Sequence, residues 1–133
     1  RRDGVTNMAP IAPYSNEVEG RARSVRRALE HARHTPQPVI GLAPEGRNHP
    51  GAVLGPLPPG VGRFIARLAP YCQVILPAGI FELDDRPCLQ FGAPYRLEVP
   101  GGLNGDALDT YTGQLVMRAI AAELPESLRG EYS

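Results

Sequence analysis

The residues of this chain that are best suited to chemistry lie at positions 41–51, which read G-L-A-P-E-G-R-N-H-P-G. An acid, Glu45, and a strong base, Arg47, stand on either side of Gly46, directly after a short apolar run. Gly46 allows a ligand to approach the backbone closely, and the planar guanidinium of Arg47 can grip a phosphate through two parallel hydrogen bonds. Glu45 can orient that arginine or bind a substrate hydroxyl. These residue types indicate a substrate-binding turn, and a turn closed by a local ion pair explains them equally well.

Two further residues near this turn are candidates for an anion contact. His49 follows it in the sequence and can contact a phosphate, although an ordinary loop histidine is the simpler explanation. Arg63 stands close to the start of a predicted helix, where free backbone amides and the helix dipole favour an anion. His31 and His34 have the i, i+3 spacing of half a metal site, but no acidic residue has a matching spacing, so no metal site is predicted.

The composition excludes several classes of function. The chain has 133 residues, which fits a single domain over residues 1–133. All 14 basic residues are arginine, and the absence of lysine excludes a P-loop and Schiff-base chemistry. A net charge of +0 and an aromatic content of 6% argue against a nucleic-acid partner. Cys72 and Cys88 lack a C-x-x-C spacing, so we expect free thiols or one disulfide rather than zinc.

Hydrophobic periodicity and the positions of glycine and proline divide the chain into alternating helices and strands. The expected helices are 17–34, a compact helix that begins at about Pro58 or Pro59 and ends near Pro70, and 106–124. The expected strands are 38–43, 73–81, 88–91 and 95–99. Alternation of this kind predicts an α/β fold, with a layered, mixed and partly parallel sheet flanked by helices.

Two of the expected helices carry an apolar stripe that predicts their buried face. In the helix 17–34 the stripe consists of Val18, Ala22, Val25, Leu29 and Ala32. In the helix 106–124 it consists of Leu108, Tyr111, Leu115, Ala119 and Ala122. The first helix is basic away from its stripe, at Arg23, Arg26 and Arg27. Such a helix can lie on an anionic lipid surface, or its charges can face solvent above a packed core.

The strand expected at 38–43 leads directly into the turn at Glu45. Its continuous apolar character predicts burial on both faces, which is typical of a parallel strand. Ligands of α/β sheets bind beyond the carboxyl ends of the strands. Glu45, Gly46 and Arg47 therefore fall at the edge of the expected sheet where a ligand would bind.

Several segments in a fixed order resemble the glycerolipid acyltransferase family, the glycerol-3-phosphate and 1-acylglycerol-3-phosphate acyltransferases. The segment A-P-E-G-R at 43–47 is similar to the F-P-E-G-T-R block of that family. After a glycine-rich loop and a helix, Q-V-I-L-P-A-G-I at 73–80 is similar to its apolar V-P-V-x-I strand. L-Q-F-G-A-P-Y at 89–95 resembles a later strand with a Gly-x-Pro turn, and the ending I-A-A-E-L-P-E-S-L-R-G-E-Y resembles the tail of some bacterial members. The likeness covers about residues 20–133.

This resemblance implies an activity and its partners. The enzymes of the family transfer an acyl group from a thioester of CoA or acyl carrier protein to a hydroxyl of a glycerol phosphate or lysophospholipid. Glu45, Gly46 and Arg47 would hold the phosphate region of that acceptor, and no metal or further cofactor is implied. The expected location is the cytoplasm, or the inner face of the membrane as a peripheral protein.

The chain departs from the family pattern at two points. The threonine of the block is missing, so Arg47 takes either the arginine or the threonine position. The family also uses a His-x-x-x-x-Asp motif, in which the histidine accepts the proton of the acceptor hydroxyl and the aspartate orients the ring. Here the residues five places after His31, His34 and His49 are Pro36, Val39 and Leu54.

No catalytic residue is therefore identifiable, and two alternatives follow. Either the chain is the carboxy-terminal part of a larger acyltransferase-like domain with the motif upstream of Arg1, or it is a catalytically silent module that binds anionic lipid or phosphate.

Overall fold

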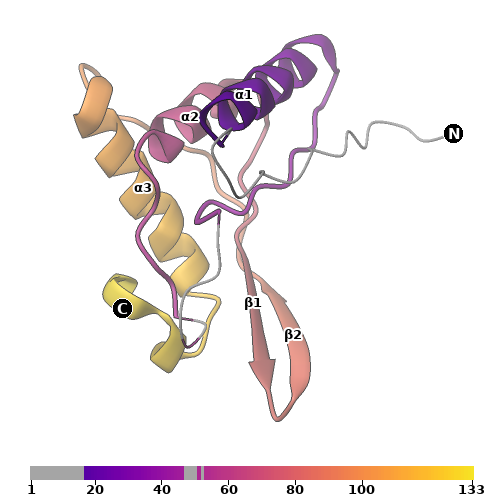
Figure 1. Cartoon of the computed structure of the whole chain (residues 1–133), viewed down its shortest axis with the longest axis vertical. Helices are drawn as coiled ribbons and strands as arrows, with labels where there is room; N and C mark the ends of the chain where they lie inside the picture. Colours follow the sequence, from indigo (N-terminus) through magenta and orange to yellow (C-terminus); the bar gives the residue numbers. More distant parts are fainter. Residues whose placement is uncertain (1–16, 47–50, 52) are drawn as a thin grey trace, which may run out of the picture.

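The structure, a computed structural model of the chain, describes residues 17–46, 51 and 53–133. In these residues the fold is mixed α/β, with three α-helices and one two-stranded antiparallel sheet. The helices are α1 (Glu17–His34), α2 (Val61–Leu68) and α3 (Gly105–Ala121), and the strands are β1 (Ala78–Leu83) and β2 (Arg86–Phe91). Short 3₁₀ helices, η2 (Ala69–Tyr71), η3 (Glu126–Leu128) and η4 (Gly130–Tyr132), follow α2 and α3. The hairpin of β1 and β2 projects away from the helices (Figure 1).

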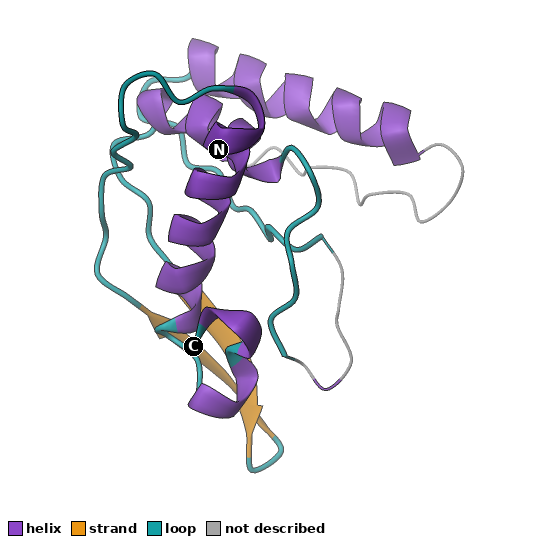
Figure 2. Ribbon diagram, turned by 90° about the vertical axis from the view of Figure 1, so that its left-hand side faces the viewer, coloured by secondary structure: helices purple, strands orange, loops and turns teal. Residues whose placement is uncertain are grey.

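Helix α1 packs on α2 at the end of the molecule opposite the hairpin (Figure 2). Their shared core consists of Ala28, Ala32 and Leu68, with Leu29, Ile40 and Phe64 packed against it. The predicted bounds of α1 are confirmed, whereas α2 is shorter at both ends than the helix expected between Pro58 and Pro70. The predicted stripe of α1 is right in its second half, since Leu29 and Ala32 face α2. It is wrong at Ala22, which is exposed because α2 has only eight residues and reaches only the carboxyl-terminal half of α1.

Helix α3 packs on α2 and on the carboxyl-terminal tail, around a second core of Met117, Ala121 and Tyr132. The predicted buried stripe of this helix is right only in part: Leu108, Leu115 and Ala119 are half-buried, whereas Tyr111 and Ala122 are exposed. The residues that α3 buries are Thr112, Gly113, Val116, Met117 and Ala121.

Small side chains explain which face of α3 is buried. A Cβ atom added to Gly62 of α2 would overlap the backbone carbonyl of Asp109 and lie 2.9 Å from the amide nitrogen of Gly113. A Cβ atom added to Gly113 would lie 3.0 Å from Leu57. The two helices therefore meet backbone to backbone, and glycine rather than the largest apolar side chain determines the contact.

The hairpin is closed by the tight turn that its sequence predicts. Ile80 pairs with Leu89, and Leu83 pairs with Arg86 at the end of the ladder. Asp84 and Asp85 form the two-residue loop with φ of 51° and 58°. Two successive positive φ values match the twist of antiparallel strands, and aspartate tolerates this region better than most residues. The acidic side chains at the tip thus belong to a hairpin turn.

The two faces of the hairpin have different neighbours. On one face, Gly79 lies against the backbone carbonyl of Glu123, and Gln90 donates a hydrogen bond of 3.0 Å to the carboxylate of Glu123. On the other face, Ile80 pairs with Leu89 and both side chains are exposed, Ile80 by 77% and Leu89 by 57%. The described residues therefore cover the hairpin on one side only.

The expected sheet of four strands is not observed, and the pairing in the described residues is antiparallel, not parallel. The expected strand 73–81 is regular only from Ala78, and 95–99 contributes a single bridge between Tyr95 and Ile75. Residues 38–43 are not a strand and pair with no other strand of the described chain. Within that segment Ile40 packs against the α1–α2 core, whereas Val39 is 87% exposed. A two-sided apolar strand needs neighbours on both sides, and the described residues do not provide them.

Candidate functional site

The turn at Glu45 follows residues 38–43 directly, at the place where the sequence predicts a turn. The amide of Gly46 donates a hydrogen bond of 3.1 Å to the carbonyl of Ala43. Gly46 has a φ of 68°, in the left-handed region that an L side chain rarely adopts. Gly46 is therefore required by the turn itself. Arg47 and His49, which were predicted to contact the ligand, lie outside the described residues.

The carboxylate of Glu45 is bound by the main chain. Its Oε2 accepts a hydrogen bond of 2.9 Å from the amide of Gly55, ten residues further on. A hydrogen bond between an ionised carboxylate and a backbone amide is among the stronger ones in proteins. Glu45 thus closes the loop that contains Arg47 and fixes both ends of that loop in space.

The carboxyl-terminal tail holds the same loop from the other side. The amide of Leu54 donates a hydrogen bond of 2.9 Å to the carbonyl of Leu128. The hydroxyl of Tyr132 donates to the carbonyl of Gly55 over 3.5 Å. Gly55 is buried, and its amide and its carbonyl are both bound, the first by Glu45 and the second by Tyr132. One residue therefore links the Glu45 turn to the last turn of the chain.

The environment of Tyr132 keeps its hydroxyl protonated. Burial raises the pKa of Tyr132 to about 12, and the charge and hydrogen bond of Glu131 and the charge of Glu45 act in the same direction. A backbone hydrogen bond with Leu57 acts against them. Two carboxylates close to a phenol disfavour a third negative charge. At neutral pH Tyr132 is therefore a hydrogen-bond donor beside the Glu45 turn.

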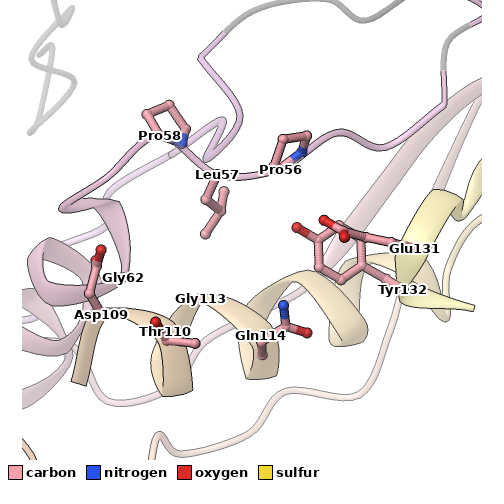
Figure 3. A pocket seen from close by; sticks show the side chains of 10 residues that line it. All are labelled: Pro56, Leu57, Pro58, Gly62, Asp109, Thr110, Gly113, Gln114, Glu131 and Tyr132. Atoms are coloured by element: carbon pink, nitrogen blue, oxygen red, sulfur yellow. The ribbon is translucent and has the colours of Figure 1, made fainter. Parts of the chain in front are cut away.

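A groove of about 180 Å³ lies between the loop that follows Gly55, helix α3 and the carboxyl-terminal tail (Figure 3). Loop residues Pro56, Leu57 and Pro58 form one side, α3 forms the other, and Tyr132 reaches toward the loop from the tail. The lining includes two carboxylates, those of Asp109 and Glu131, and no basic side chain. Such a groove suits an uncharged, partly apolar group and repels a phosphate.

The predicted anion site at the start of α2 is not formed as expected. The amides of Gly60 and Arg63 donate hydrogen bonds of 2.8 Å and 2.9 Å to the two carboxylate oxygens of Asp109. The free amides on which the prediction relied are therefore bound to a carboxylate of α3. The side chain of Arg63 is exposed, and its contact with an anion stays a prediction.

The remaining candidates form no further site in the described part of the chain. No group of three or more His, Cys, Asp or Glu residues that could hold a metal ion occurs there. Cys72 and Cys88 are free thiols, and burial raises the pKa of Cys72. Among helices α1, α2 and α3, none is both long and apolar enough to cross a membrane.

Three residues that organise the site were missed in the sequence. Gly55, Asp109 and Tyr132 each act over a long separation along the chain, with Asp109 binding amides 46 and 49 residues away and Tyr132 a carbonyl 77 residues away. Local periodicity and motif spacing do not reach across such distances. The only signal was the resemblance of the tail segment I-A-A-E-L-P-E-S-L-R-G-E-Y, which contains Tyr132.

Searches against protein-family models, curated proteins and solved structures gave no significant match to this chain. The resemblance of the segments 43–47 and 73–80 to the acyltransferases thus rests on their residues and their order. A functional proposal has to come from the geometry of the site.

Proposed function

We propose that this chain is the acceptor-binding part of a glycerolipid acyltransferase-like enzyme. In this proposal Glu45, Gly46 and Arg47 hold the phosphate region of a glycerol phosphate or lysophospholipid. The observation that carries it is the bond between Glu45 and Gly55, because it fixes the backbone immediately before Arg47. The acid of the motif binds the main chain at Gly55, and in this proposal Arg47 binds the ligand. The glycine between them supplies the required left-handed backbone.

The reaction is an acyl transfer between a thioester and an alcohol. The acceptor hydroxyl oxygen attacks the thioester carbonyl of acyl-CoA or acyl carrier protein, the carbon–sulfur bond breaks, and the thiol leaves with the proton that the hydroxyl gave up. A general base has to accept that proton first. The given sequence holds no His-x-x-x-x-Asp motif, so the proposal assigns this base to residues upstream of Arg1. No metal and no further cofactor is required.

The proposal includes a larger sheet than the one observed. Residues 38–43 and the strand β1 would lie in a layered, partly parallel sheet, completed by strands outside the described residues. Three features support this: residues 38–43 are mostly apolar, they pair with no described strand, and one face of the hairpin is open. Enzymes of this class act at the cytoplasmic face of a membrane, and the exposed side chains of Arg23, Arg26 and Arg27 on α1 suit peripheral contact with anionic lipid.

A second candidate is a catalytically silent module that binds anionic lipid or phosphate. The missing His-x-x-x-x-Asp motif favours it, because the acceptor turn is present without its base. Such a module would use the same turn and the same arginine. It would bind anionic vesicles in a salt-dependent manner and transfer no acyl group.

One experiment distinguishes the acyltransferase from the silent binding module. The polypeptide encoded with its upstream residues is assayed with acyl-CoA and acyl carrier protein thioesters, against glycerol 3-phosphate and lysophosphatidate. We expect acyl transfer, with a KM for the acceptor that rises about tenfold or more in Arg47→Gln, since a charge-assisted bidentate contact is lost. Arg86→Gln, on the exposed hairpin, is the matched control and should change nothing. Salt-sensitive vesicle binding without transfer would instead support the silent module, and neither activity would reject both.

A further inference from the structure

The hydrogen bonds of the hairpin determine which of its backbone groups point outward. The two-residue loop makes Leu83 and Arg86 the pair that closes the turn, so these two residues bond to each other. Bonded and non-bonded pairs alternate along antiparallel strands. At the other end of the hairpin, the bond of 3.0 Å from the amide of Gly92 to the carbonyl of Pro77 has the same phase. Every second residue of β1 therefore directs its amide and carbonyl away from β2, namely Ala78, Ile80 and Glu82.

The two outer edges of the hairpin differ in what they can bind. On β1 all three outward residues carry an amide hydrogen, and these groups bond to no other backbone group of the described residues. On β2 the first outward residue is Pro87, which has no amide hydrogen to donate. Proline on an edge strand hinders the pairing of a further strand. The edge of β1 is therefore open to another strand, whereas the edge of β2 is blocked.

We propose that the open edge of β1 pairs with β1 of a second copy of this chain. The two strands run antiparallel about a twofold axis at Ile80, and the two hairpins form one continuous sheet. Ile80 lies opposite Ile80 of the second copy, and Ala78 lies opposite its Glu82. In this register the outward residues face one another as hydrogen-bonded pairs, each of which exchanges two bonds. The inference goes beyond the proposed function and does not rest on it.

The apolar side chains of the hairpin fit this register. Ile80 and Leu89 lie opposite each other on the open face, where they are 77% and 57% exposed. Pairing at the twofold axis places the two copies of Ile80 side by side, with Leu89 on the outer side of each. These four side chains form an apolar row across the joined sheet, and such cross-strand contacts stabilise a sheet. The pairing thus covers one flank of the most exposed large apolar side chain of the hairpin.

The charges of the hairpin favour the antiparallel orientation. Its tip is acidic, with Glu82, Asp84 and Asp85. Parallel strands would place the two tips side by side, where like charges repel each other. In the antiparallel pair each Glu82 lies opposite Ala78 of the other copy, which separates the two carboxylates by about 13 Å along the strands. That distance exceeds the screening length of about 8 Å at physiological salt. The net charge of +0 adds no overall repulsion between the copies.

The blocked edge of β2 limits the assembly to two copies. The twofold axis uses the open edge of both β1 strands, and an interface of this kind closes on itself. The outer edges of the joined sheet are then the two β2 strands, each of which carries Pro87. The hairpin projects away from the helices, so its edge is presented at the surface of the molecule (Figure 1).

Sedimentation equilibrium of the chain over a range of concentrations, with Ile80→Pro and Leu89→Pro as a matched pair, tests the edge directly. Both changes remove an outward amide and an apolar side chain from the same cross-strand pair, and neither removes a bond between β1 and β2. The parent and Leu89→Pro should approach twice the mass of one chain. Ile80→Pro should raise the dimer Kd about a hundredfold, because one amide is lost from each copy and with it two hydrogen bonds. A monomeric parent, or equal Kd values for the two variants, would overturn the proposal.

Pro87→Val restores an outward amide to the edge of β2. We expect this variant to form species larger than a dimer, because the outer edges of the joined sheet can then accept further strands. A Pro87→Val chain that remains a dimer would overturn the assignment of Pro87 as the block.

The register is tested by isotope-filtered NMR of a dimer mixed from labelled and unlabelled chains. Gly79 lies opposite Phe81 of the second copy as a non-hydrogen-bonded pair, in which the Cα atoms are about 4.5 Å apart. We expect an intermolecular NOE between the Hα protons of these two residues. Intermolecular contacts confined to the side chains of Ile80 and Leu89 would show that two open faces pack on each other, and would overturn the edge pairing.

Hydrogen exchange distinguishes a second copy from a strand of the same polypeptide. The outward amides of β1 should exchange rapidly in dilute solution and become protected as the dimer forms, whereas the inward amide of Phe81 should stay protected throughout. Protection of the outward amides in a monomer would place a strand of the same chain on β1. That result would overturn the pairing of two copies and leave the proposed function intact.

Discussion

The molecule has two parts that differ in how well they are packed. The closed half consists of α2, α3 and the carboxyl-terminal tail, and the open half consists of the hairpin and residues 38–43. In the first half Met117 is 0% exposed, and glycine lets the two helices meet backbone to backbone. In the second half Ile80 is 77% exposed and residues 38–43 pair with no described strand. The first half buries its largest apolar side chains in a common core, whereas the second half leaves several exposed and packs only Ile40 against the α1–α2 core.

This difference bears on where function can be tested. The Glu45 turn is tied to the closed half through Gly55 and Tyr132. Its geometry therefore depends on contacts within the described chain, and ligand binding can be measured on the chain as it is. The open half is where further strands and the general base of the proposed enzyme would have to join. In the proposed enzyme, acyl transfer therefore requires a general base that the closed half does not contain.

The largest expected effect on the free energy of unfolding comes from a substitution where α2 contacts α3. Gly62→Ala places a Cβ atom against the backbone of Asp109, which cannot give way as a flexible side chain would. We expect the free energy of unfolding to fall by about 4 kcal/mol or more, or the closed half to fail to fold. Denaturant unfolding followed by circular dichroism measures this loss. The control is Gly20→Ala in α1, where the added Cβ atom would meet no other part of the molecule within 4 Å. The stability of that helix should rise by up to about 1 kcal/mol. Equal changes in the free energy of unfolding for Gly62→Ala and Gly20→Ala would contradict the close contact between α2 and α3.

The second effect is a cavity in the core of the closed half. Met117→Ala removes the largest of the fully buried side chains, and we expect a loss of about 2 to 5 kcal/mol. The midpoint of urea unfolding should fall accordingly. A loss below about 1 kcal/mol would mean that this half is as loosely packed as the hairpin.

The third effect depends on pH and on Tyr132. Its pKa is raised from 10 to about 12 in the folded protein, so folding favours the neutral phenol. The resulting stability is fully present below pH 10, the unfolded pKa, and is lost as the pH rises through about 12. We expect the parent to lose about 2 kcal/mol over this interval relative to Tyr132→Phe, which has no group to ionise there. Thermal melts of both proteins from pH 9 to pH 12 show the difference. Parallel curves would contradict the buried, hydrogen-bonded state of Tyr132.

The smallest effect is on the open face of the hairpin. Ile80→Ser or Leu89→Ser should change the free energy of unfolding by no more than about 0.5 kcal/mol, because both side chains already contact solvent. The same changes should reduce self-association in analytical ultracentrifugation, since they remove exposed apolar surface. A loss of about 2 kcal/mol would show that this face is covered, and the contrast between the two halves would fail.

Local features of the fold could be predicted from the sequence. The bounds of α1 follow from the 3.6-residue period and from the prolines beyond its end. The helix α2 lies inside the range that its flanking prolines mark, and the turn at Asp84 and Asp85 follows from its residue types. The partner of a strand could not be predicted in the same way. A continuous apolar run such as 73–81 indicates burial but does not specify which strand it pairs with, or in which direction.

The candidate site was predictable in its residues but not in its contacts. The position of Glu45 and Gly46 on a sharp turn after an apolar segment could be predicted from the sequence. That Glu45 binds a backbone amide, and that the tail holds the same loop, could not be, since both partners lie beyond any local pattern. The buried face of α3 was mispredicted for a related reason: close contact between Gly62 and Gly113 outweighs the stripe of larger side chains.

The central claim is that the turn at Glu45 presents Arg47 to a phosphate. Calorimetric titration of the chain with glycerol 3-phosphate, with glycerol as the uncharged comparison, tests it most directly. The account predicts binding of glycerol 3-phosphate that weakens with salt, weakens about tenfold or more in Arg47→Gln, and is unchanged in Arg86→Gln, with no binding of glycerol. An affinity for glycerol 3-phosphate that Arg47→Gln leaves unchanged, or no binding at low salt, would contradict it. The turn would then only close a loop, through the bond from Gly55 to Glu45.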